Sequence, residues 1–102
     1  MTAKQEDDWE DQLIEVDPPL LGKSKVLFTA HARLQMEIRG ISARQVLQVI
    51  GSPHEYHDAD MGRVRARRIR SGGSSAIDVV YELDLEQIVV VTAIAKHWKK
   101  RR

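Results

Sequence analysis

The sequence predicts an α+β domain in which two helices pack on a three- to four-stranded antiparallel sheet. Two observations carry this prediction: residues 30–51 hold two capped segments with helical spacing, and residues 63–95 hold segments that alternate or are rich in β-branched residues. Helices followed by strands favour helices that gather on one side of the sheet. With 102 residues the chain suits one such domain rather than two.

The two helices have clear start and stop signals. The first is expected over residues 30–39, because Thr29 can cap its first turn and Gly40 suits the left-handed position after a helix. The second starts after Ser42, since Ser42 and Gln45 match the S-x-x-Q capping box, and it stops at a Gly-Ser-Pro tripeptide.

The strands are expected mainly after the helices. Residues 26–28 form a short apolar run that suits a brief strand, and residues 63–67 and 77–83 alternate as half-buried strands do. Residues 88–95 are apolar on both parities and rich in β-branched side chains. This pattern predicts a central strand that is covered on both faces.

Charge divides the chain into an acidic leader, residues 1–22, a domain, residues 23–98, and a basic tail, residues 99–102. The leader carries one basic and seven acidic side chains, a net charge of −6, whereas residues 23–102 carry 15 basic and eight acidic ones, a net charge of +7. A basic domain of this size is a candidate for binding RNA or another phosphate-rich polymer. Many small basic domains bind no nucleic acid, so the charge alone leaves both interpretations open.

The leader contains an apolar stripe. Trp9, Leu13 and Val16 recur at helical spacing, and the Asp-Pro-Pro that follows would stop a short amphipathic helix. Such a segment could cover the basic face of its own domain and mask phosphate-binding arginines. The alternative is a disordered tail that aids solubility.

Several classes of function are excluded by composition. The chain has no cysteine, so disulfides, thiolate metal sites and cysteine nucleophiles are ruled out. It has no apolar signal core and no run long enough to cross a membrane, which favours a cytoplasmic protein without a membrane partner. No phosphate-binding loop, dinucleotide fingerprint or Ser-His-Asp pattern is present, so no cofactor is expected. A polar cluster lacks metal-ligand spacing and predicts an edge strand rather than a metal site: His54, Tyr56, His57, Asp58 and Asp60.

His31, Gln35 and Arg39 form the first candidate site. They recur every four residues in the first predicted helix, so an imidazole, an amide and a guanidinium would project from one face. A structural role is the alternative, because a histidine can bond nearby backbone and an arginine can satisfy the last carbonyls of a helix.

The same segment carries a resemblance. The pattern H-A-x-x-R-x-x-x-R-G-I-S of the small bacterial proteins in domain-of-unknown-function family 4258 is similar to residues 31–42, with Gln35 in place of the family's usual first arginine. The resemblance covers residues 26–97. It implies a relation to the RelE, ParE and BrnT toxins, which set helices against a small antiparallel sheet and in several branches cut RNA. A toxin-like protein would also have an acidic, antitoxin-like partner.

A row of strand arginines is the second candidate site. Arg63, Arg65 and Arg67 share one parity, with about 6.6–6.8 Å between alternate side chains, so they could follow successive phosphates together with Lys96. Protection of an edge strand against aggregation explains the same pattern equally well. Arg68 and Arg70 fall on the opposite parity.

These groups could supply metal-independent RNA cleavage. His31 or His97 would act as base or acid, and the charge that develops on phosphorus would be stabilised by cations from Arg39, Arg65 and Lys96. His97 could instead begin a frayed tail. The alternative function is a non-catalytic module that binds nucleic acid or an acidic protein, and a third is a degenerate active surface.

Overall fold

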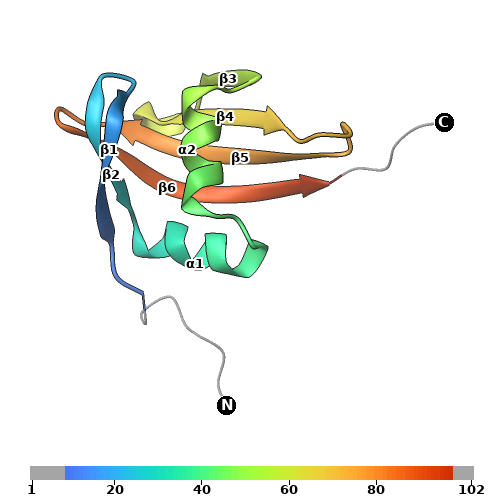
Figure 1. The fold of residues 1–102 in the computed structure, drawn as a ribbon, viewed down its shortest axis with the longest axis horizontal. Coiled ribbons are helices and arrows are strands. Elements are labelled where there is room, and N and C mark those ends of the chain that lie inside the picture. Colours follow the sequence, from blue (N-terminus) through green and yellow to red (C-terminus); the bar gives the residue numbers. More distant parts are fainter. Residues whose placement is uncertain (1–8, 98–102) are drawn as a thin grey trace, which may run out of the picture.

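The computed structural model describes residues 9–97, which form a six-stranded mixed sheet with two helices (Figure 1). The order across the sheet is β1-β2-β6-β5-β4-β3, and every neighbouring pair is antiparallel except β2 and β6. The elements in chain order are β1 (Gln12–Leu20), β2 (Lys23–Phe28), α1 (Ala30–Arg39), α2 (Ala43–Gly51), β3 (Glu55–Asp58), a 3₁₀ turn (Asp60–Gly62), β4 (Val64–Ile69), β5 (Ser75–Leu83) and β6 (Gln87–His97).

Both predicted helices are confirmed, together with their caps. The Thr29 hydroxyl accepts a hydrogen bond from the Ala32 amide at 3.1 Å, and Gly40 closes α1 with a φ of +66°. At the start of α2, the Gln45 amide donates to Ser42 Oγ at 3.1 Å and the Ser42 amide donates to Gln45 Oε1 at 2.9 Å. Neither helix in the described residues is long and apolar enough to cross a membrane.

The α+β class is confirmed, but the expected sheet was too small and purely antiparallel. One strand was not predicted, β1, which forms one edge of the sheet, and the predicted polar edge strand, β3, forms the other. β2 pairs with β6 in parallel, and α1, α2 and three strands lie between them in the chain, which gives room for the crossover that a parallel pair needs. The central position of β6 is confirmed.

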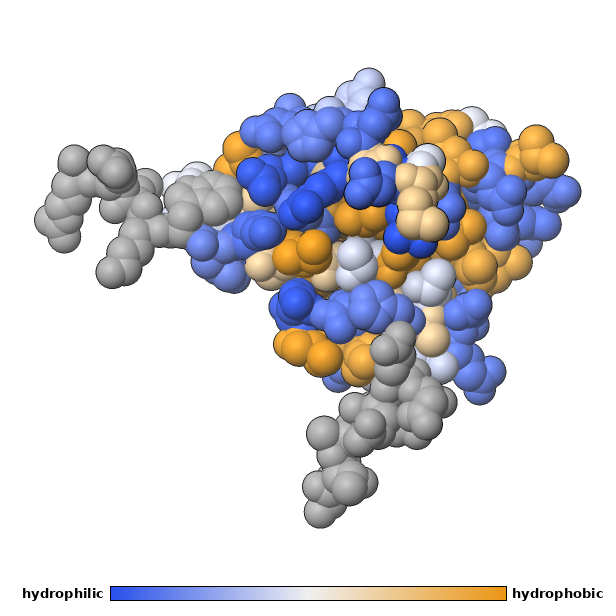
Figure 2. Space-filling model, turned by 180° about the vertical axis from the view of Figure 1, so that it is seen from behind, coloured by the Kyte–Doolittle hydropathy of each residue, from blue (hydrophilic) through white to orange (hydrophobic). Residues whose placement is uncertain are grey.

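The core lies between the helices and one face of the sheet. α1 packs along β6, and α2 crosses β5 and β4. Phe28, Val46 and Val90 are at most 1 % exposed in this layer. The opposite face carries polar and apolar side chains next to one another (Figure 2). Val89 and Ile94 of β6 are only half-buried, so the prediction of a strand covered on both faces is wrong.

The predicted leader helix is wrong from Gln12 onward, because this part of the chain is an edge strand. Leu13 pairs with Leu27 and Ile14 with Val26, which makes β1 and β2 an antiparallel hairpin. Ile14 and Val16 are half-buried while their neighbours are exposed, so the segment follows the period of two of a strand rather than a helical period. The boundary expected at residue 22 lies in the turn of this hairpin.

The residues before β1 dock on α1. The Ala30 amide donates to Asp11 Oδ1 at 2.7 Å, and Arg33 Nη1 donates to the Glu10 carbonyl at 2.7 Å. The Arg33 guanidinium also lies 5.3 Å from the centre of the Trp9 ring. A carboxylate at a helix N-terminus is favourable. The described part of the leader therefore extends the sheet and anchors α1, at the edge opposite β3 and β4, instead of covering the strand arginines; residues 1–8 and 98–102 lie outside the described residues.

Replacing Asp11 tests this anchor. Asp11→Ala is expected to lower the free energy of unfolding by about 1 kcal/mol, because the Ala30 amide loses its acceptor. Asp11→Asn is the control, since its amide oxygen can still accept the bond. Denaturant unfolding measures both variants; equal stability of Asp11→Ala and the wild type would contradict the anchoring role.

Candidate functional site

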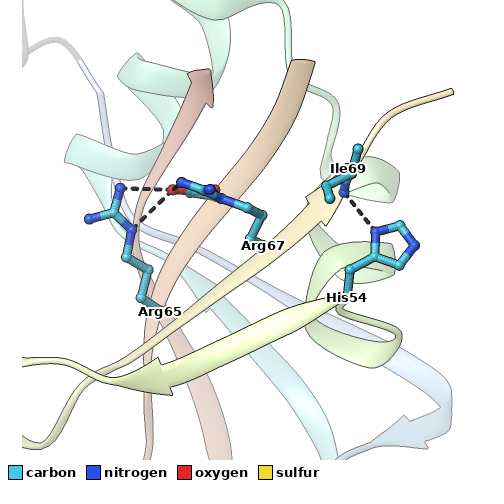
Figure 3. Close-up of polar contacts among 5 residues, drawn as sticks. His54, Arg65, Arg67 and Ile69 are labelled. Carbon is cyan, nitrogen blue, oxygen red and sulfur yellow. Dashed lines mark hydrogen bonds and ion pairs between the residues drawn. The ribbon is translucent and has the colours of Figure 1, made fainter. Parts of the chain in front are cut away.

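Asp78 is fully buried on the sheet face that no helix covers. β4 and β5 pair Arg67 with Asp78, and Arg65 lies two residues before Arg67 on the same face. Asp78 Oδ2 accepts hydrogen bonds from Arg65 Nε at 3.0 Å, Arg65 Nη2 at 2.7 Å and Arg67 Nη2 at 3.1 Å. Asp78 Oδ1 accepts one from Arg67 Nε at 2.8 Å. The two arginines hold the carboxylate between them and cover it (Figure 3).

This cluster, Arg65, Arg67 and Asp78, stays ionised. Burial on its own would raise the pKa of Asp78, but hydrogen bonds and charges from Arg67 and Arg65 outweigh it and lower the pKa below its ordinary value of 3.8. The hydrogen bond to Asp78 likewise raises the pKa of Arg67. Two cations and one anion leave the cluster with a net charge of +1.

The predicted row of strand arginines shares one face, but two of its three positive charges are offset within the chain. Arg63 Nε lies 3.8 Å from Glu82 Oε2, and Arg65 and Arg67 bind Asp78. Sequence reasoning missed these partners because they depend on the register of β4 with β5. One signal was present, since Asp78 interrupts the apolar run of residues 76–81.

A groove of about 260 Å³ lies between α2 and the end of β4. It contains two arginines of the parity opposite to the row, Arg68 and Arg70, and Arg68 Nη1 donates to the Ser52 carbonyl at 2.6 Å. No acidic side chain from residues 9–97 lines it. Its lining residues are Gln45, Gln48, Val49, Arg68, Ile69, Arg70, Ser71 and Ile77.

Lys96 and His97 lie at the same end of the sheet as this groove. Ala76 pairs with both Ile69 and Lys96, and Ser75 pairs with His97, so the ends of β4, β5 and β6 meet there. We call this end, with its four groups Arg68, Arg70, Lys96 and His97, the basic end. The stretches 68–77 and 93–97 contain no acidic residue. Arg68 and Arg70 were not predicted as site residues, although their parity was visible.

The opposite end of the strands is acidic. Val64, at the start of β4, pairs with Asp58 and with Tyr81, and the β5–β6 turn follows directly. Five acidic residues gather there, and we call them the acidic end: Asp58, Asp60, Glu82, Asp84 and Glu86. Three basic residues, Lys23, Lys25 and Arg63, also lie at this end, so the sheet is polarised along its strands by an excess of acidic over basic residues there.

His31 and Arg39 do not converge on a single point. Both are exposed, and eight residues of helix place them about 12 Å apart along the axis of α1. A ligand that contacts both of them and Gln35 would have to span this distance along the helix. α1 runs along β6 toward its C-terminal end, so Arg39 lies at the end of α1 nearer to His97, with His31 two turns earlier (Figure 1).

His54 has a structural role. Its Nδ1 accepts a hydrogen bond from the Ile69 amide at 2.8 Å (Figure 3), and its own amide donates to the Arg67 carbonyl at 2.8 Å. The polar cluster that follows forms the exposed edge strand β3, as predicted. Among residues 9–97, no group of three or more His, Asp or Glu side chains is placed to hold a metal ion.

Replacing Asp78 tests the cluster. Asp78→Asn is expected to lower the free energy of unfolding by about 3 kcal/mol, because two neighbouring arginines lose their counter-charge. The matched control is Glu82→Gln on the same face, whose half-exposed ion pair with Arg63 should change stability by less than about 1 kcal/mol. Equal effects of the two substitutions in denaturant unfolding would contradict the assignment.

The stabilisation by Asp78 should also depend on pH. Its pKa in the folded chain lies below the ordinary value of 3.8, so its contribution is fully present above that value and is lost as the pH falls through the folded pKa. The stability difference between wild type and Asp78→Asn should therefore be constant near neutral pH and shrink in acid. A difference that grows in acid would contradict this sign.

Comparison with known proteins places the chain in a family. Residues 28–95, most of the chain, match the family model described as domain of unknown function DUF4258. No curated protein and no solved structure matches the chain. The relation to the RelE and ParE toxins therefore stays a prediction. The match starts at the last residue of β2 and includes both helices and nearly all of β6, and on this ground the chain belongs to the DUF4258 family.

Proposed function

We propose that this protein is a nucleic-acid-binding module that holds the phosphate backbone of an RNA strand at the basic end. The polarity of the sheet carries this proposal. Arg68 and Arg70 on the helix-covered face and Lys96 on the opposite face lie at one end of the sheet, the neighbouring stretches of chain contain no acidic residue, and four further basic residues follow in the sequence after Trp98. Each phosphate that such cations neutralise releases counterions, which favours binding.

The basic end supports this function better than the row of strand arginines. Within the row, Glu82 and Asp78 offset two of the three positive charges. A phosphate that approached Arg65 or Arg67 would compete with the buried Asp78 carboxylate for the same N–H groups. Lys96 is the one residue of the expected phosphate-binding set that lies at the basic end.

RNA cleavage is the second candidate function, and the position of His97 next to Lys96 favours it. A histidine there could take the proton of a 2′-hydroxyl or protonate the leaving 5′-oxygen, while Lys96 stabilises the charge on phosphorus. Cleavage needs both an acid and a base. His31 lies two helical turns before Arg39, away from His97, so a binding function is the simpler proposal. An acidic, antitoxin-like protein would compete with RNA for this end.

Salt dependence tests RNA binding. The double variant Arg70→Gln, Lys96→Gln should weaken binding of a fluorescent single-stranded RNA and reduce the slope of log K against log salt by about 1.4, or about 0.7 for each phosphate that is no longer neutralised. Arg63→Gln, at the acidic end, is the control and should leave the slope unchanged. Fluorescence anisotropy measures both; an unchanged slope in the double variant would remove the basic end from the interface.

Cleavage is tested separately. If the protein cuts RNA, His97→Ala should reduce the rate in the presence of a chelator by about 100-fold or more while RNA affinity stays near that of the wild type. Gel analysis of a labelled RNA measures the rate. Intact RNA after prolonged incubation with the wild type would reduce the function to binding alone.

A further inference from the structure

We propose that the groove between α2 and β4 binds a phosphate monoester. Resting on the proposed function, this group would be the phosphorylated end of an RNA strand. The polar lining that carries the proposal comes from both sides of the groove: Gln45, Gln48, Arg68, Arg70 and Ser71.

The size of the groove suits a small polar group. Its volume of about 260 Å³ lies just below the range of about 300–1,000 Å³ typical of sites for drug-sized ligands. Val49 and Ile77, which are 1 % and 4 % exposed, form its apolar part. Apolar surroundings strengthen a charged hydrogen bond, because they lower the local dielectric constant. The groove is therefore large enough to take a phosphate group.

The charge of the groove suits a monoester rather than the internal phosphate of a strand. Two guanidinium groups line it, Arg68 and Arg70, and no carboxylate does among the residues that the structure describes. A phosphate monoester carries about −1.5 to −2 charges at pH 7, which two arginines can balance. An internal phosphodiester carries a single charge, which one arginine would balance. Arginine also presents paired N–H groups that match phosphate oxygens.

Part of the site is held in place before a ligand arrives. The Ser52 carbonyl at the end of α2 fixes Arg68 through Nη1, and this bond uses only one of the five guanidinium N–H groups. The capping bond from the Ser42 amide to Gln45 Oε1 fixes the Gln45 side chain and leaves its NH₂ group as a donor. Groups fixed in advance lose little conformational entropy on binding.

The bond of Arg68 to Ser52 also stabilises the end of α2, so a variant of Arg68 alone would not distinguish this role from ligand binding. A variant of Arg70 does distinguish them. Arg70 is exposed and follows the last residue of β4. Arg70→Gln should therefore leave the fold intact, as thermal melting will check, and remove one of the two charges. Arg68→Lys is the second variant, because it keeps the charge and loses the paired N–H geometry.

Inorganic phosphate is the first probe. Titrated into the full chain at constant ionic strength, it should give saturable NMR shifts at the Nε–H groups of Arg68 and Arg70, and none at Arg63. Arg70→Gln should weaken phosphate binding about tenfold, as loss of a charged hydrogen bond does, and Arg63→Gln should not weaken it. Shifts that fail to saturate, or that are as large at Arg63, would overturn the proposal.

Two RNA strands of one sequence, with a 5′-phosphate or a 5′-hydroxyl, are the second probe. The phosphorylated strand should bind about tenfold more tightly, and Arg70→Gln should abolish this preference. RNA binding without a preference, together with no response to phosphate, would overturn the groove proposal and leave the proposed function standing. Saturable phosphate binding without affinity for either RNA would uphold the groove and overturn the RNA function.

Discussion

The ion pairs of the buried Asp78 carboxylate with Arg65 and Arg67 are the interaction on which the open face of the sheet depends. A charge without exposure is costly unless it is paired and hydrogen-bonded, and on this face no helix can cover it. Arg65 and Arg67 provide the pairing and the cover together. They also tie β4 to β5 through side chains as well as through the strand ladder. Arg65 and Arg67 therefore stabilise the fold, and the cations of the basic end are better placed to bind a ligand.

The sequence signals that succeeded are local ones. The capping box of Ser42 with Gln45 and the Gly40 stop lie within a few residues of the helices that they delimit, so they need no knowledge of the rest of the chain. The helix prediction for β1 was wrong because Trp9, Leu13 and Val16 match a helical period by coincidence. Pairing with β2 makes the segment a strand. The parallel β2–β6 pair joins segments about sixty residues apart, which no local pattern reveals.

The candidate sites divide in the same way. The shared parity of Arg63, Arg65 and Arg67 was visible in the sequence, but their carboxylate partners lie on another strand and depend on register. The basic end arises in the same manner, since Arg70 and Lys96 are far apart in the chain and are brought to one end of the sheet by the pairing of β4 and β6 with β5. The sequence predicts a helix that carries both His31 and Arg39, but the helical spacing alone does not show how far the rise of the helix separates them along its axis.

The charge state of Asp78 can be measured directly by following its carboxyl carbon by NMR through an acid titration of the whole chain. We predict that the midpoint of its titration lies below 3.8, and that the Nε–H protons of Arg65 and Arg67 stay protected from exchange at pH values above that midpoint. A carboxyl that titrates at or above 3.8 would show that the arginines do not hold it. They would then be available as cations, which contradicts the central claim.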